Sequence, residues 1–244
     1  MQRIFVKLAF LLSLLCLSPW CWAEASRDFD GNDDTVSFGD VTIIDGAAAL
    51  TAIAWLNIDV AAPSSAYSVL RKDGSFNAQF FGGASNDVAC SIWATTLGPG
   101  RITHTWGTGA WNQYLCRWDN GVIGGDSEIY KDLTSLGTID GNDTSTIANS
   151  ANQLRFGGTE ASPPVEDYDG KMSYVRYYTR YLTLVELTEE FYRPGIIPAN
   201  LVGFWPLWGD STEIDLSGNG NTGTVSGSTA NSAGPPIMIG DAPL

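Results

Sequence analysis

Polar and apolar residues alternate along most of the chain, in short runs separated by glycine, proline, aspartate and asparagine. The run 87–96 (DVACSIWATT) shows the pattern clearly, because Val88, Cys90 and Ile92 share one face and the other face is mixed. A period of two is typical of a half-buried β-strand. Runs of this kind predict strands over the following ranges: 35–38, 50–56, 67–71, 78–81, 87–96, 101–106, 111–118, 128–131, 153–157 and 170–178.

The stretch 111–133 (WNQYLCRWDNGVIGGDSEIYKDL) predicts the central hairpin of the fold. Its first strand ends at Asp119, and Asn120-Gly121 then favours a type I′ turn, which needs positive φ at both central residues. Gly124 and Gly125 are expected to lengthen this connection.

One segment departs from the strand pattern. Thr183 and Glu186 have the spacing of a capping box, in which the hydroxyl and the carboxylate each accept a hydrogen bond from a free amide at the start of a helix. The sequence therefore predicts a short helix from about Leu184 to Tyr192, ending before Pro194.

Several of these segments together resemble a known group of domains. The hairpin carries a strand-opening Trp111 and a Trp-Asp-x-Gly turn, residues 29–34 read FDGNDD, and residues 170–178 read GKMSYVRYY. This set resembles laminin-G and pentraxin-like domains of the concanavalin A-like lectins and glucanases. The resemblance implies an all-β fold, an antiparallel jelly-roll β-sandwich with one short helix, and a role in binding or processing carbohydrate.

The C-terminal stretch has an unusual order for such domains. Residues 202–207 and 215–224 resemble a segment often found before the FDGxDD pattern, yet here they follow the predicted helix. A circularly permuted closure would bring residues 201–225 against strands 27–38. No linker or second core pattern divides residues 24–244, so we expect one domain, with a loose tail of about 15 residues at its end.

The first residues predict export. Arg3 and Lys7 precede an apolar run that ends near Pro19, and Ala23 closes the stretch. This is the layout of a secretory signal peptide over residues 1–23, with cleavage near Ala25 or a retained membrane anchor as alternatives. No later segment is apolar enough to span a bilayer. The mature chain is expected to be secreted or otherwise extracytoplasmic.

Removing Arg3 and Lys7 leaves 11 basic residues against 27 acidic ones, a net charge of −16. Such a surface repels phosphate backbones, which argues against nucleic acid as a partner. Cys90 and Cys116 remain after cleavage, in a compartment where disulfides persist. We expect them to pair, the alternative being two buried free thiols.

No complete catalytic constellation is visible. Glucanases on this fold use paired carboxylates on one strand, and the nearest candidates are Glu213 with Asp215, and Glu166 with Asp167 and Asp169. Glucanases commonly carry Glu-x-Asp-x-x-Glu, and both sets lack the third carboxylate of that pattern. His104 is the chain's only histidine and is expected to be a packed residue rather than a catalytic one.

Oxygen-rich turns suggest a calcium site. Ca²⁺ takes six to eight oxygen ligands, and the candidate ligands are Asp30, Asp33, Asp169, Asp215 and Asn219. The alternative is that these side chains bond to their own backbone in Asx-turns. The calcium pair of the pentraxins is not implied, because only Glu160 follows the strand at 153–157.

Sugar rings stack well on flat aromatic side chains, and Trp93 and Trp106 are the candidates for exposed platforms. Trp55, Trp111, Trp118 and Trp205 are expected in the core. The function predicted is a non-catalytic module that binds a glycan or a surface glycoprotein, with calcium assisting. The alternatives are an adhesion or assembly subunit, in which the chain would form oligomers, and a polysaccharide-active enzyme.

Overall fold

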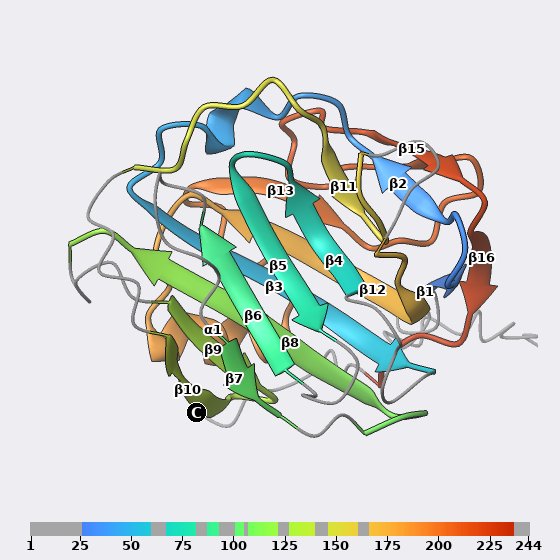
Figure 1. Ribbon diagram of the computed structural model, residues 1–244, viewed down its shortest axis with the longest axis horizontal. Helices are drawn as coiled ribbons and strands as arrows, with labels where there is room; N and C mark the ends of the chain where they lie inside the picture. Colours follow the sequence, from blue (N-terminus) through green and yellow to red (C-terminus); the bar gives the residue numbers. More distant parts are fainter. Residues whose placement is uncertain are drawn as a thin grey trace, which may run out of the picture.

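The computed structural model describes residues 26–59, 67–81, 87–92, 101–104, 107–121, 127–139, 146–160 and 166–236. In these ranges the predicted strands, together with strands at 26–30, 134–139, 201–205, 212–213, 223–226 and 229–232 that were not predicted, form two antiparallel sheets. The sheets pack face to face as a jelly-roll β-sandwich, viewed in Figure 1 with one sheet in front of the other. The expected all-β fold is confirmed.

Sheet A is built around the central hairpin. In spatial order it contains β10 (Thr134–Ile139), β9 (Ser127–Lys131), β8 (Trp111–Asp119), β3 (Ala49–Ile58), β12 (Asp169–Tyr178), β1 (Ser26–Asp30) and β16 (Thr229–Ser232), and β13 (Leu201–Trp205) also pairs with β12. The predicted hairpin is confirmed, because β8 and β9 are hydrogen-bonded neighbours with Trp118 opposite Ser127.

Sheet B is the second layer. In spatial order it contains β14 (Thr212–Glu213), β15 (Gly223–Ser226), β2 (Thr35–Ser37), β11 (Leu154–Phe156), β4 (Tyr67–Lys72), β5 (Phe76–Phe81), β6 (Asp87–Ile92) and β7 (Arg101–Thr103). A short 3₁₀-helix, Thr42–Ile44, lies between β2 and β3.

The main core fills the space between the sheets. It is assembled from alternate strand residues such as Val36, Phe156, Ala52 and Tyr177, which are buried, together with the indoles of Trp118 and Trp205. Trp55 is also buried, whereas Trp111 is only half-buried at the start of β8. The placement predicted for these tryptophans is confirmed, apart from this partial exposure of Trp111.

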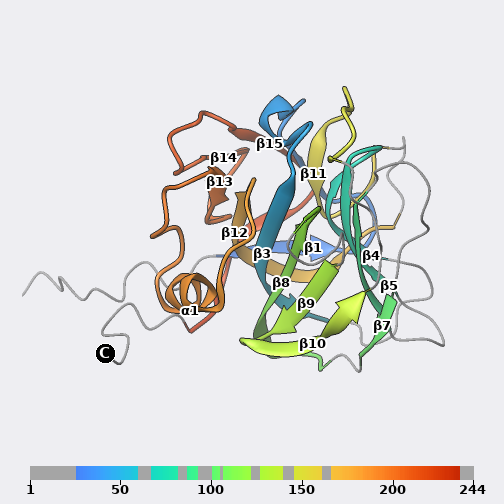
Figure 2. The ribbon, with the colours of Figure 1, turned by 90° about the vertical axis from the view of Figure 1, so that its left-hand side faces the viewer.

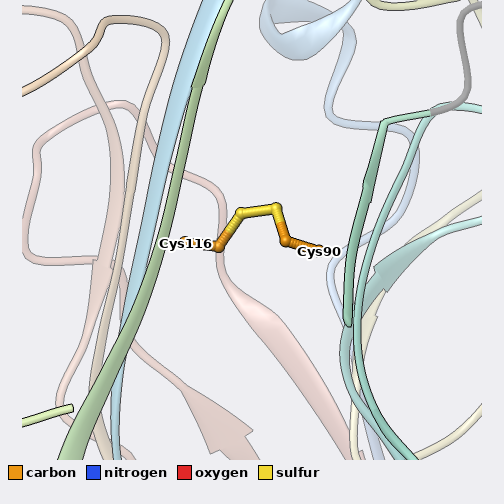
Figure 3. The surroundings of a disulfide bond; sticks show 2 residues. All are labelled: Cys90 and Cys116. Atoms are coloured by element: carbon orange, nitrogen blue, oxygen red, sulfur yellow. A yellow bond between two sulfur atoms is a disulfide. The ribbon is translucent and has the colours of Figure 1, made fainter. Parts of the chain in front are cut away.

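A disulfide joins the two sheets. Cys90 of β6 and Cys116 of β8 are bonded across the core with a Cα–Cα distance of 6.0 Å (Figure 3). The predicted pairing is therefore confirmed. It closes a loop of 26 residues.

The predicted helix is α1, Leu184–Tyr192, and its capping box is present: the Thr183 hydroxyl accepts from the Glu186 amide, and the Glu186 carboxylate accepts from the Thr183 amide. Leu187 of this helix packs on Ile53, Leu115 and Tyr178, whose chain neighbours face the main core. Helix α1 therefore covers part of the outer face of sheet A, as Figure 2 shows at the lower left of the sandwich.

The C-terminal stretch completes the sandwich. Strand β15 pairs with β2, β16 pairs with β1, and the Phe38 and Trp205 rings lie 4.6 Å apart. The predicted contact between residues 201–225 and the 27–38 strands is confirmed. Strand order continues to Ser232, and residues 1–25 and 237–244, which include the predicted signal peptide and the end of the expected tail, lie outside the described residues.

Within the described ranges, no helix has the length and apolar character needed to cross a membrane.

Candidate functional site

The two outer faces of the sandwich differ in what covers them. Helix α1 packs on sheet A through buried side chains, whereas no described helix lies over sheet B, whose outer face is turned towards the viewer in Figure 1. Among the described residues, the outer face of sheet B is therefore the sheet face on which no helix packs.

Strand register places a polar row across this face. Thr224 lies opposite Ser37, Ser37 opposite Arg155, and Arg155 opposite Arg71. The adjacent row, which runs through Val36 and Cys90, belongs to the core, so the polar row faces outward.

The two arginines of this row have different partners. Arg71 forms ion pairs with Asp73 and with Glu166, the latter at 2.6 Å from Nη1 to Oε2. Arg155 donates from Nη1 to the carbonyl of Thr159 at 3.1 Å and from Nη2 to the Gln153 side chain at 3.0 Å. Its Nε is buried and has no acceptor among the described residues.

The tryptophans predicted as sugar platforms cannot be placed on this face. Trp93 and Trp106 lie outside the described residues.

A group of carboxylates surrounds the turn between β1 and β2, which we call the acidic turn (residues 30–34). Oxygens of Asp30, Asp33 and Asp34 all lie within 4.8 Å of one another. Asp34 is 5 % exposed and accepts a hydrogen bond from the Asp30 amide at 2.7 Å. The predicted ligands Asp30 and Asp33 are thus brought together, whereas Asp169 stands opposite Asp30 on β12 and is not part of this group of three.

The carboxylates at this turn perturb one another. Burial first, and then the charges of the acidic turn, raise the pKa of Asp167 to about 6. Burial is also the main cause that raises the pKa of Asp34 and of Asp169, with neighbouring aspartates adding to it. The Oδ1 atom of Asp167 is buried and accepts no hydrogen bond from the described part of the chain. This arrangement favours a proton or a cation beside Asp167.

The other two predicted calcium ligands lie in a different loop and bond to the backbone. Asp215 accepts hydrogen bonds from the amides of Phe204, Ser217 and Asn221 at 3.0, 2.8 and 3.0 Å. The Asn219 side chain donates to the carbonyls of Leu201 and Val202. The loop therefore agrees with the alternative interpretation, in which these side chains bond to backbone groups. The bonds to Leu201, Val202 and Phe204 hold the loop against β13.

The carboxylates considered for catalysis are similarly engaged. Glu213 lies on the short strand β14, fully buried, and its Oε1 accepts from Nε of Arg27 at 2.7 Å. Burial raises the pKa of Glu213, and the Arg27 charge opposes that rise. Glu166 pairs with Arg71. His104 packs edge-on against Tyr114 with ring centroids 6.1 Å apart, which agrees with the expectation of a packed histidine.

Sequence reasoning did not single out Arg71, Arg155 or Asp34 as site residues. Asp34 could have been identified from the FDGNDD pattern, because it directly precedes strand β2 and accepts a hydrogen bond from the Asp30 amide. The arginines lie in segments correctly predicted as strands, 67–71 and 153–157. The two arginines are close only because β11 pairs with β4, and no local sequence pattern predicts which distant strands pair.

Comparison with known proteins gives a family match. Residues 30–188 match the model of the family Laminin_G_3, described as the concanavalin A-like lectin/glucanases superfamily. No curated protein matches the sequence.

Solved structures give the same architecture. The chain is similar to a Bacteroides ovatus protein proposed to bind carbohydrate (TM-score 0.71, 17 % identity), covering 89 % of this chain and 62 % of that one. It is similar to the SAP-like pentraxin of Limulus polyphemus (TM-score 0.59, 12 % identity), covering 89 % and 98 %. It is also similar to the CBM40 module of a Ruminococcus gnavus sialidase bound to α2,3-sialyllactose (TM-score 0.52, 12 % identity), covering 66 % and 94 %. At these identities the likeness establishes the fold.

Proposed function

Because the chain belongs to the Laminin_G_3 family of the concanavalin A-like lectin/glucanase superfamily, we propose that it is an exported, non-catalytic module that binds glycans on the outer face of sheet B. The observation that carries the proposal is the difference between the two faces. Helix α1 packs on part of the outer face of sheet A, whereas sheet B presents a row of polar side chains that can bond to sugar hydroxyls.

The solved structures support the ligand class. A protein proposed to bind carbohydrate and a module bound to sialyllactose share this fold over most of the described chain. A glycan on a surface glycoprotein would be recognised by the same face.

The absence of catalysis is proposed from the carboxylates. Glycoside hydrolysis by the usual route needs two carboxyl groups across the scissile bond, one of them able to deliver a proton. Glu213 is enclosed with Arg27 in the protein interior, and Glu166 is held by Arg71. Neither is paired with a second free carboxylate on the sheet B face among the described residues.

Calcium binding at the acidic turn is the second part of the proposal. Asp30, Asp33 and Asp34 supply clustered carboxylate oxygens, and Asp167 adds a buried oxygen that accepts no hydrogen bond from the described residues. Backbone carbonyls and water would complete the six to eight oxygens that Ca²⁺ takes. Asp215 and Asn219 are left out of this site, because their side chains are already bonded to backbone groups.

A glycan array probed with the mature protein, with calcium and with chelator, tests both parts. Selective binding supports the module, and its loss in chelator supports calcium near the site. The variant Asp33→Asn should lose the calcium effect, whereas Asp210→Asn, an exposed control with the same charge change, should keep it. An empty array in both conditions would contradict glycan binding and favour the assembly or adhesion alternative.

Export is tested separately. Residues 1–23 carry the features of a signal peptide, and the chain keeps a disulfide. Cell fractionation followed by N-terminal sequencing should recover extracytoplasmic protein that begins at Glu24. Protein retained in the cytoplasm with Met1 intact would contradict this part of the proposal.

A further inference from the structure

We propose that Arg71 and Arg155 form a subsite on the outer face of sheet B for the carboxylate of an acidic sugar. This inference rests on the proposed function and names the ligand class that its binding face selects. Three features of the described residues carry it: the register of the two arginines, the unequal compensation of their charges, and the unused donor of Arg155.

Register puts two positive charges side by side. Arg155 of β11 lies directly opposite Arg71 of β4, and both occupy the outward row. Directly opposite residues on antiparallel strands have Cβ atoms about 5 Å apart, and like charges in such positions destabilise the sheet. A pair of this kind needs anions nearby.

Neighbouring carboxylates neutralise the charges of the two arginines unequally. Arg71 has two carboxylate partners, Asp73 and Glu166. Arg155 has no carboxylate within 4.0 Å among the described residues, and its acceptors, the Thr159 carbonyl and the Gln153 amide, are neutral. Among the described residues, the charge of Arg155 therefore has no anionic partner.

Arg155 also carries a hydrogen-bond donor without an acceptor among the described residues. The Nε–H of Arg155 is buried without an acceptor, and a buried donor left unpaired costs about 1–3 kcal/mol. A guanidinium presents its donors as a planar fork that matches a carboxylate, so one carboxylate oxygen can accept from Nε while the other accepts from a remaining N–H. A ligand carboxylate beside Arg155 supplies a counterion for the guanidinium and an acceptor for its Nε–H.

The surrounding acidic residues limit what this ligand can be. The mature chain carries a net charge of −16, which repels polyanions at long range. Glu166 pairs with Arg71, so its negative charge disfavours further anionic groups on a ligand there. The chemistry therefore fits a short saccharide with an isolated carboxylate, such as a uronic or sialic acid residue, better than a polyanion.

Calorimetric titration of the full mature protein with matched pairs of probes tests the inference. The pairs are α2,3-sialyllactose against lactose, and an oligogalacturonate against its carboxyl-reduced form. We expect at least one acidic probe to bind tenfold or more tightly than its neutral partner. The variant Arg155→Gln should remove that preference while changing neutral-sugar affinity less than about twofold, a contrast that loss of one charge-assisted contact predicts.

Controls separate this role from a structural one. Arg155→Lys keeps the charge and loses the fork, so it should retain an intermediate preference. Arg193→Gln makes the same charge change at an exposed site at the end of α1 and should bind as the wild type does. Urea midpoints of all variants establish that each is folded.

The outcomes are distinguishable. Glycan binding with no preference for the acidic probe, or a preference that survives Arg155→Gln, would overturn the inference and leave the proposed function standing. Equal affinity for 3′-sulfolactose would overturn the assignment to a carboxylate. Binding of no saccharide at all would overturn the proposed function and this inference together.

Discussion

Arg27 and Glu213 form an ion pair in which both side chains are fully buried, although 186 residues separate them in sequence. Nε of Arg27 lies 2.7 Å from Oε1 of Glu213, and the same guanidinium donates to the Ser228 carbonyl at 3.0 Å. These buried bonds thus hold strand β1 to β14 and to the chain near Ser228. A buried pair of charges is tolerated because hydrogen bonds satisfy the atoms that would otherwise be left without partners.

Breaking this pair should be strongly destabilising. Glu213→Gln leaves the Arg27 charge buried without its counterion, so we expect the free energy of unfolding to fall by about 3–5 kcal/mol. Urea denaturation followed by circular dichroism measures the change. Lys171→Gln is the matched control, since Lys171 pairs with Asp59 at 3.1 Å in an exposed position, and should cost less than about 1 kcal/mol. Equal effects at the two sites would contradict the role assigned to Arg27 and Glu213.

The bond between Cys90 and Cys116 ties sheet B to sheet A, and removing it should loosen the sandwich. In the chain-entropy model a closed loop of this length stabilises by about 3 kcal/mol. The double variant Cys90→Ala/Cys116→Ala should lose stability of that order in urea denaturation. Wild-type protein treated with a reductant should move to a similar midpoint, and an unchanged midpoint in both cases would argue against a stabilising disulfide.

Stability near the acidic turn should depend on pH through Asp167. Its pKa in the folded protein, about 6, lies above the ordinary value of 3.8, so its neutral form stabilises the fold fully below pH 3.8 and that contribution is lost as pH rises through 6. Asp167→Asn cannot ionise. Its stability relative to the wild type should therefore rise between pH 4 and pH 7, by about 1–2 kcal/mol after allowance for solvent screening.

Calcium should reverse this pattern. A cation held by the acidic turn makes the ionised form of Asp167 favourable, and a ligand that binds only the folded state stabilises it by about 2.7 kcal/mol at one hundred times its Kd. Thermal unfolding at pH 7 with and without Ca²⁺ should show a larger gain for the wild type than for Asp167→Asn. A difference between the two proteins that is independent of pH and of calcium would refute the assignment.

The loop that begins at Asp215 should behave as structure rather than as a metal site. Asp215→Ala removes the acceptor of three backbone amides, so we expect a loss of about 2 kcal/mol or more. The loss should be the same in calcium and in chelator. A loss confined to calcium-containing buffer would instead return Asp215 to the list of metal ligands.

Features with a local cause could be predicted from the sequence. Period-two alternation identified strands between β2 and β12, although β1, β10 and β13 to β16 were not predicted. The spacing of Thr183 and Glu186 identified the helix start, and the resemblance of residues 202–224 to a family segment led to the contact with the first strands. Each of these depends on residues close together in the chain or on a recurring motif.

Features that depend on pairing between distant strands could not be predicted. Arg71 and Arg155 are opposite each other only because β11 lies next to β4, and Arg27 meets Glu213 only because β1 and β14 converge. Polar side chains in a loop are similarly ambiguous: Asp215 and Asn219 have the residue types of a calcium loop, and their hydrogen bonds instead go to β13 and to the loop itself.

The central claim, that glycans bind the outer face of sheet B, is tested most directly by blocking each face in turn. Thr224→Cys puts a single reactive thiol at an exposed position in register with Ser37 on that face, and Thr188→Cys puts one at an exposed position on α1, over sheet A. Each variant is labelled with a bulky maleimide and titrated against a glycan that the wild type binds. We expect the label at position 224 to abolish binding and the label at position 188 to leave it unchanged. Undiminished binding with the label at 224, or loss only with the label at 188, would contradict this claim.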